Sequence, residues 1–113
     1  MKLKSGDTLF MNVENGAMAL QIIGRSDVPR VEKEGRGWRD GAKAILDGAD
    51  VAELLYAIGC DSWGGEIRDT GLSVKSWHGV TVLSVDGHSA ELSRPERVLL
   101  MHAIRGHAWR LFT

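Results

Sequence analysis

The sequence contains one cysteine, Cys60, two prolines and no long apolar run. A lone cysteine cannot form an internal disulfide, and a metal site would need ligands other than a set of thiolates. No stretch approaches the ~18 apolar residues that a membrane helix requires, and the N-terminal residues lack the apolar segment of a secretory signal. We therefore expect a cytoplasmic chain that folds without disulfides and does not cross a membrane.

Net charge is also small, because 14 basic residues balance 15 acidic ones and leave a formal charge of -1. This balance excludes a global attraction to nucleic acid or to an anionic membrane, so such binding would have to be local. Hydrophobic residues make up 43% of the 113 positions, which argues against intrinsic disorder. The length and composition predict a single globular domain over 1–113.

Glycine and tryptophan are abundant, with 14 and 4 residues respectively. The glycines predict many tight turns. Four tryptophans are more than one small core usually needs, so some of them are candidates for a binding surface.

The segment 93–106 carries the clearest helix signals. Ser93 is a candidate N-cap, and Glu96, three residues later, completes a capping box. We expect Gly106 to end the helix in a left-handed conformation. Apolar residues cover most of the circumference and leave a polar stripe that includes Arg97, so we expect this helix to be covered on more than one side.

Two shorter helices are expected upstream. The first, over 41–48, would be capped by Asp40, and the second, over 51–59, would begin with the capping pair Asp50 and Glu53. Apolar residues in the second segment recur at i, i+3, i+4 and i+7 spacing, which predicts a face directed at the core.

Strand signals flank these helices. Asn15 and Gly16 predict a tight turn in a hairpin over 8–24; a helix through 14–23 is the rival interpretation. Segment 72–92 predicts a three-strand meander with turns at 78–79 and 86–87.

The remaining segments are less regular. We expect 60–71 to be an irregular connection and 107–112 to add a final strand. Together, the elements predict an α+β domain with an antiparallel sheet built from hairpins and two or three helices packed on one face.

The charged segment 25–41 predicts a long loop, and it is the first candidate for a binding surface. Tryptophan and arginine dominate the binding energy of protein interfaces, so this loop suits a protein partner. The same residue types can stack a base and hold a phosphate. A solvated loop that neutralises its own charges is the third interpretation. The partner-binding candidates are Arg30, Lys33, Arg36, Trp38 and Arg39 in this loop, with Trp63 from the glycine-rich segment.

The histidines do not predict a metal site, although imidazole is a common metal ligand. His102 and His107 are five residues apart and do not share a helix face, while His78 and His88 lie near two different turns. Asp61, Glu66 and Asp69 do not have the spacing of a calcium loop. We therefore expect no metal.

Catalytic and cofactor motifs are equally weak. Cys60 follows the C-terminus of its predicted helix, where the helix dipole disfavours a thiolate nucleophile. Gly64 and Gly65 lack the preceding strand and the lysine of a phosphate-binding loop, so no cofactor is expected.

These observations predict a small non-enzymatic protein that binds another macromolecule, with a protein as the preferred partner. A near-neutral, motif-poor chain of this size is typical of the accessory and inhibitor proteins of mobile elements such as phages. One alternative is a nucleic-acid-binding module that uses the loop 30–41. A second is a small enzyme that uses His78, His88 and Asp61. A homodimer through an unpaired tail strand at 109–112 is also compatible with the pattern.

Overall fold

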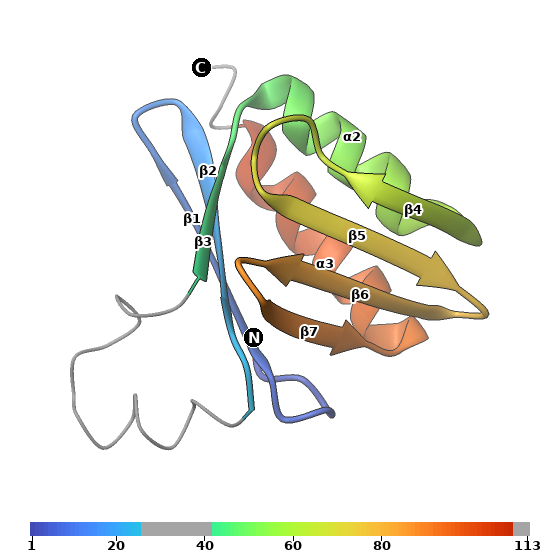
Figure 1. The fold of residues 1–113 in the computed structure, drawn as a ribbon. Helices are drawn as coiled ribbons and strands as arrows, with labels where there is room; N and C mark the ends of the chain where they lie inside the picture. Colours follow the sequence, from blue (N-terminus) through green and yellow to red (C-terminus); the bar gives the residue numbers. More distant parts are fainter. Residues whose placement is uncertain (26–41, 110–113) are drawn as a thin grey trace.

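A computed structural model describes residues 1–25 and 42–109, which fold into two antiparallel sheets and two helices (Figure 1). The elements in chain order are β1 (Thr8–Glu14), β2 (Ala17–Ile23), β3 (Ala42–Leu46), α2 (Gly48–Gly59), β4 (Ser62–Glu66), β5 (Leu72–Trp77), β6 (Val80–Val85), β7 (His88–Leu92) and α3 (Arg94–Ala108). Sheet A has the strand order β1-β2-β3, and sheet B has the order β4-β5-β6-β7. The predicted α+β class is confirmed, with two sheets in place of one.

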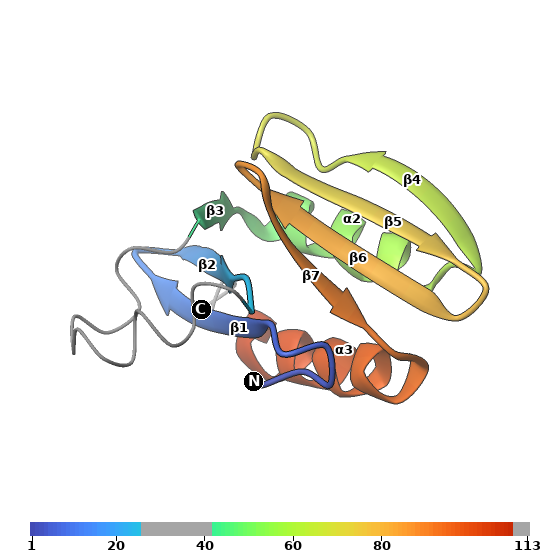
Figure 2. The same cartoon turned by 60° about the horizontal axis from the view of Figure 1, so that its bottom comes forward.

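Both helices lie on the same side of sheet B (Figures 1 and 2). Helix α2 packs against β4 and β5, α3 packs against β6 and β7, and the two helices touch each other. Sheet A joins the assembly through β1, which contacts α3, and through β2, which contacts β7. One cluster of buried apolar side chains therefore runs through both sheets and both helices.

The predicted hairpin over 8–24 is confirmed. Glu14 pairs with Ala17, and Asn15 and Gly16 between them have φ angles of 53° and 76°. A two-residue turn with both φ angles positive matches the right-handed twist of its strands. The rival helix through this segment is wrong.

The predicted meander over 72–92 is also confirmed, as β5, β6 and β7. Its turns have positive φ angles at His78, Gly79, Asp86 and Gly87. The preceding segment is not an irregular connection, because it contains β4, which pairs with β5. Strand propensity does not predict β4, because glycine is unfavourable in strands and β4 contains two glycines. Pairing with β5 stabilises it as a strand.

The predicted helix over 41–48 is wrong, because this part of the chain forms β3 and pairs with β2. Lys43 and Ile45 are exposed while Ala44 and Leu46 are buried, which is the two-residue period of a strand. Asp40, the expected cap, lies outside the described residues.

The second predicted helix is confirmed as α2, but its cap lies earlier than expected. The Asp47 carboxylate accepts a hydrogen bond from the Asp50 N–H at 2.8 Å, and the Asp50 carboxylate accepts one from the Asp47 N–H at 3.0 Å. The capping box therefore joins Asp47 and Asp50, and the expected pair of Asp50 with Glu53 is wrong.

The start of α3 is confirmed, since Glu96 Oε1 accepts hydrogen bonds from the N–H and the hydroxyl of Ser93, at 3.0 and 2.8 Å. Its end is not, because Gly106 lies inside a helix that continues to Ala108. The predicted tail strand is therefore wrong at 107–108, and 110–112 lie outside the described residues.

Helix α3 is contacted by α2, by β1 and by sheet B, but the expected polar stripe is wrong. Val98 is 48% exposed and Leu99 is 60% exposed, whereas Arg97 is buried. Apolar composition does not decide which residues of a helix are buried, and here the neighbouring elements leave the side with Val98 and Leu99 uncovered. Within residues 1–25 and 42–109, no helix is long and apolar enough to cross a membrane.

Candidate functional site

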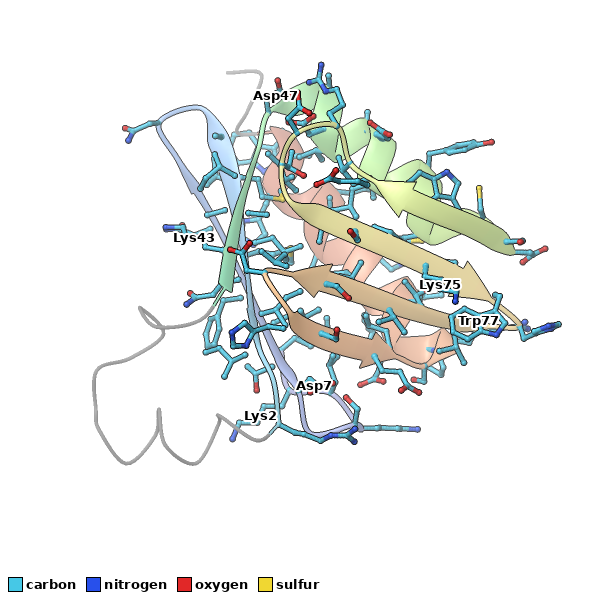
Figure 3. The ribbon with its side chains drawn as sticks, viewed as in Figure 1. Lys2, Asp7, Lys43, Asp47, Lys75 and Trp77 are labelled. Atoms are coloured by element: carbon cyan, nitrogen blue, oxygen red, sulfur yellow. The ribbon has the colours of Figure 1, made fainter. Side chains whose placement is uncertain are left out.

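The outer face of sheet B, opposite the helices, is the candidate site. Directly paired residues of neighbouring strands point to the same face, and successive residues alternate between faces. In β5, Leu72, Val74 and Ser76 are buried toward the helices, whereas Lys75 and Trp77 are exposed. Figure 3 shows Lys75 and Trp77 together on the side of the sheet away from α2 and α3.

A hollow of about 840 Å³ opens on this face over β4, β5 and β6. Small residues make it possible, because Ser73 and Ser84 have short side chains and Gly64 has none. A Cβ built on Gly64 would meet no other atom within 4 Å, so the space beside it is open. Trp77 and Val82 supply apolar surface within the same hollow.

Lys75 and Trp77 interact directly. The Lys75 ammonium nitrogen lies 4.8 Å from the centroid of the Trp77 ring, which is the geometry of a cation–π contact. Trp77 is still 39% exposed. It presents a large rigid surface with a positive charge held beside it, a combination that can anchor a partner protein or stack on a base.

A second, smaller hollow of about 360 Å³ adjoins Trp77 at the end of the strands. Asp61, His78 and Arg94 line it. A Cβ on Gly79 would come within 3.2 Å of the Arg94 guanidinium, so Arg94 packs closely against the β5–β6 turn. Trp77 therefore lines two hollows of different character, one over a glycine-rich strand and one lined by Asp61 and Arg94.

No protein-family model, no curated protein and no solved structure matches this chain. The functional assignment therefore depends on the geometry of the chain itself.

Most of the predicted partner-binding residues lie outside the described part of the chain, namely Arg30, Lys33, Arg36, Trp38 and Arg39. Trp63 is described and is half-buried in β4, where it packs against the core cluster. Its ring lies against Gly65, since a Cβ there would be 3.3 Å from Trp63 Cη2. The loop surface stays a prediction, and Trp63 contributes to the core as well as to the edge of the larger hollow.

Sequence reasoning missed Trp77. The signal was the parity of β5, because Trp77 is an odd-numbered residue like Lys75, whereas the buried Leu72 and Val74 are even-numbered. A tryptophan on the polar parity of an alternating strand is a candidate surface anchor.

Of the residues considered for catalysis, Asp61 and His78 line the smaller hollow together, whereas His88 lines a different one. In the described part of the chain, no three His, Cys, Asp or Glu side chains come together in a metal-binding arrangement. Cys60 is the C-cap of α2, at the helix end that the sequence indicated. On the outer face of sheet B, the Ser84 hydroxyl is 2.9 Å from that of Ser89, so it is paired with another hydroxyl and not with a base.

A charged network lies away from this face, at the start of α2. Arg68 Nε donates to Asp50 Oδ1 at 2.6 Å, and Arg68 Nη2 contacts Asp47 Oδ1 at 2.9 Å. The hydrogen bond from the Asp50 N–H, together with the charge of Arg68, holds the pKa of Asp47 below its ordinary value. Because each of these carboxylates caps the helix, we assign this network a structural role.

Proposed function

We propose that this protein acts by binding another protein, and that Trp77 anchors the partner on the outer face of sheet B. The observation that carries the proposal is a tryptophan 39% exposed beside a hollow of about 840 Å³, with the Lys75 ammonium over its ring. Binding energy in protein interfaces concentrates in a few large aromatic and cationic residues seated beside pockets. The outer face of sheet B has these components.

The predicted loop surface belongs to the same proposal as a second contact. Arg36, Trp38 and Arg39 have the composition of an interface hot spot. The near-neutral, motif-poor composition supports an accessory or inhibitor protein of a mobile element, acting in the cytoplasm, as the class to which such a binder belongs.

The experiment is affinity capture of the tagged protein from a lysate of its own cell, followed by mass spectrometry. Trp77→Ala is the test variant. Tyr56→Ala is the matched control, because Tyr56 is 68% exposed on α2, away from the outer face of sheet B. We expect a stoichiometric partner with the wild type and with Tyr56→Ala, and its loss with Trp77→Ala at an unchanged melting temperature.

Two results would contradict the proposal. A partner retained by folded Trp77→Ala would remove the anchor role of Trp77. A partner released by nuclease or lost steeply with salt would replace protein binding by nucleic-acid binding, because phosphate contacts release counterions. A separate triple variant, Arg36→Ala with Trp38→Ala and Arg39→Ala, tests the loop surface independently.

A further inference from the structure

Edge strand β4 differs from the other sheet edges. Along β1, the Met1 ammonium donates to the Leu9 carbonyl at 2.6 Å, and the Leu9 N–H donates to the Met1 carbonyl at 2.9 Å, so the chain covers its own edge there. Strand β7 faces sheet A, and its Glu91 N–H donates to the Asp7 carboxylate at 3.2 Å. Strand β3 carries Lys43, and an exposed lysine is a common device against edge pairing.

Strand β4 has none of these protections. The Ile67 N–H donates to the Leu72 carbonyl at 2.8 Å, and hydrogen-bonded residues alternate along an antiparallel ladder. The backbone groups of Ser62, Gly64 and Glu66 therefore point away from β5. All three residues are exposed, and no described element lies beyond β4 in Figures 1 and 2. The strand has no proline, lysine or bulge that would disfavour another strand beside it.

We propose that β4 pairs antiparallel with β4 of a second copy of this chain, about a two-fold axis at Gly64. Gly64 then faces its own equivalent, and Ser62 faces Glu66 of the second copy. Each of these pairs exchanges two backbone hydrogen bonds, about six in all. The four strands of each sheet B become one continuous sheet with both outer faces on the same side.

The side chains of β4 suit this self-pairing. On the outer face, the two Gly64 residues meet at the axis, and neither carries a side chain. The absence of a side chain at the axis allows the two backbones to approach without collision.

The polar side chains on the outer face are complementary in the same register. Ser62 and Glu66 are both exposed, and each Ser62 falls opposite Glu66 of the second copy, so its hydroxyl can donate a hydrogen bond to that carboxylate. The same pair recurs on both sides of the two-fold axis. This self-complementary pattern favours a second copy over an unrelated strand.

The test is the solution mass by sedimentation equilibrium over a concentration series. We expect a dimer for the wild type and a monomer for Gly64→Pro, because proline removes the outward N–H but no bond within the sheet. Ile45→Pro is the matched control. Ile45 is 55% exposed in β3, the edge strand of sheet A, and its N–H points away from β2. It should remain a dimer. A wild type that stays monomeric at every concentration, or a dimeric Gly64→Pro, overturns the proposal.

A second proline variant tests the same pairing. The N–H of Ser62 also points away from β5, so Ser62→Pro removes another outward donor but no bond within the sheet, and it should also be monomeric. A dimeric Ser62→Pro would refute the pairing. Trp77→Ala should lose the partner of the proposed function yet remain dimeric, so the two proposals fail separately.

Discussion

The carboxylate of Glu96, in the first turn of α3, accepts a hydrogen bond from the backbone N–H of Lys4 at 2.8 Å, 92 residues away in the sequence. The same carboxylate binds Ser93 and so caps the helix. Asp7 plays a similar part, because it accepts the backbone N–H groups of Arg25 at 2.9 Å and Glu91 at 3.2 Å. Two carboxylates thus attach the N-terminal segment to α3 and to both sheets.

The first prediction concerns Glu96, which is buried and whose carboxylate accepts three hydrogen bonds, from the Lys4 N–H, the Ser93 N–H and the Ser93 hydroxyl. Glu96→Ala should lower the free energy of unfolding by about 2 kcal/mol, because it removes a cap and charge-assisted hydrogen bonds. Chemical denaturation measures this loss. Glu91→Ala is the control, since that side chain is exposed and should stay within about 0.5 kcal/mol. Equal effects of the two variants would contradict the tether.

The second prediction is a loss of stability in acid. Burial raises the pKa of Asp7 and of Glu96, but hydrogen bonds outweigh it, and both pKa values lie below their ordinary 3.8 and 4.5. The donors are Ser5, Arg25 and Glu91 for Asp7, and Ser93 and Lys4 for Glu96. A carboxyl whose pKa is depressed by folding stabilises the fold above its unfolded pKa, and the gain is lost as pH falls through the folded value. The melting temperature should therefore decline as pH falls below about 4.5.

Variants assign this decline to its groups. Asp7→Asn and Glu96→Gln do not titrate, so each should be less stable than the wild type at pH 7 and should approach it at low pH. Thermal melts from neutral to acid pH provide the comparison. Profiles that run parallel to the wild type throughout would show that other carboxyls produce the acid sensitivity.

The parts of the fold that were predicted correctly have local causes. The β1–β2 turn needs only Asn15 and Gly16, and the start of α3 needs only Ser93 and Glu96. The prediction of a helix at β3 was wrong because alanine and leucine favour a helix locally, whereas pairing with β2 makes this segment a strand. The exposure of Leu99 was not predicted for a similar reason, because the arrangement of sheet B and β1 decides which side of α3 is covered.

The candidate site was less accessible to sequence reasoning. A hollow on a sheet depends on which residues of three strands share a face, and β4 was not recognised as a strand. Once the register of β4 against β5 is known, Gly64 falls beside Lys75, and the alternation of side chains along each strand gives the residues of the outer face. Trp77 is then identified as an exposed aromatic residue on that face.

The third prediction separates the observed helix cap from the expected one. Asp50 is buried and bonded to the Asp47 N–H and to Arg68, whereas Glu53 has no hydrogen-bond or ion-pair partner among residues 1–25 and 42–109. Asp50→Ala should cost about 1–2 kcal/mol of unfolding free energy, within the usual range for a capping residue. Glu53→Ala should cost less than about 0.5 kcal/mol. Denaturant unfolding of both variants compares the two losses of unfolding free energy. A larger loss for Glu53→Ala would show that the helix is capped by the pair Asp50 and Glu53.

The fourth prediction contrasts two glycines that have equal space around them. A Cβ would meet nothing within 4 Å at Gly16 or at Gly64, but Gly16 has a φ of 76° and Gly64 is not in the positive-φ region. Gly16→Ala should therefore destabilise the fold by about 1 kcal/mol, because an L-residue is strained in the left-handed region. Gly64→Ala should leave stability unchanged or raise it slightly, since alanine restricts the unfolded chain more than glycine does. Both are measured by denaturant unfolding at a protein concentration where the oligomeric state is known. A loss with Gly64→Ala as large as that with Gly16→Ala would mean that β4 tolerates no side chain at this position, and the hollow beside it would then be too shallow to hold a partner.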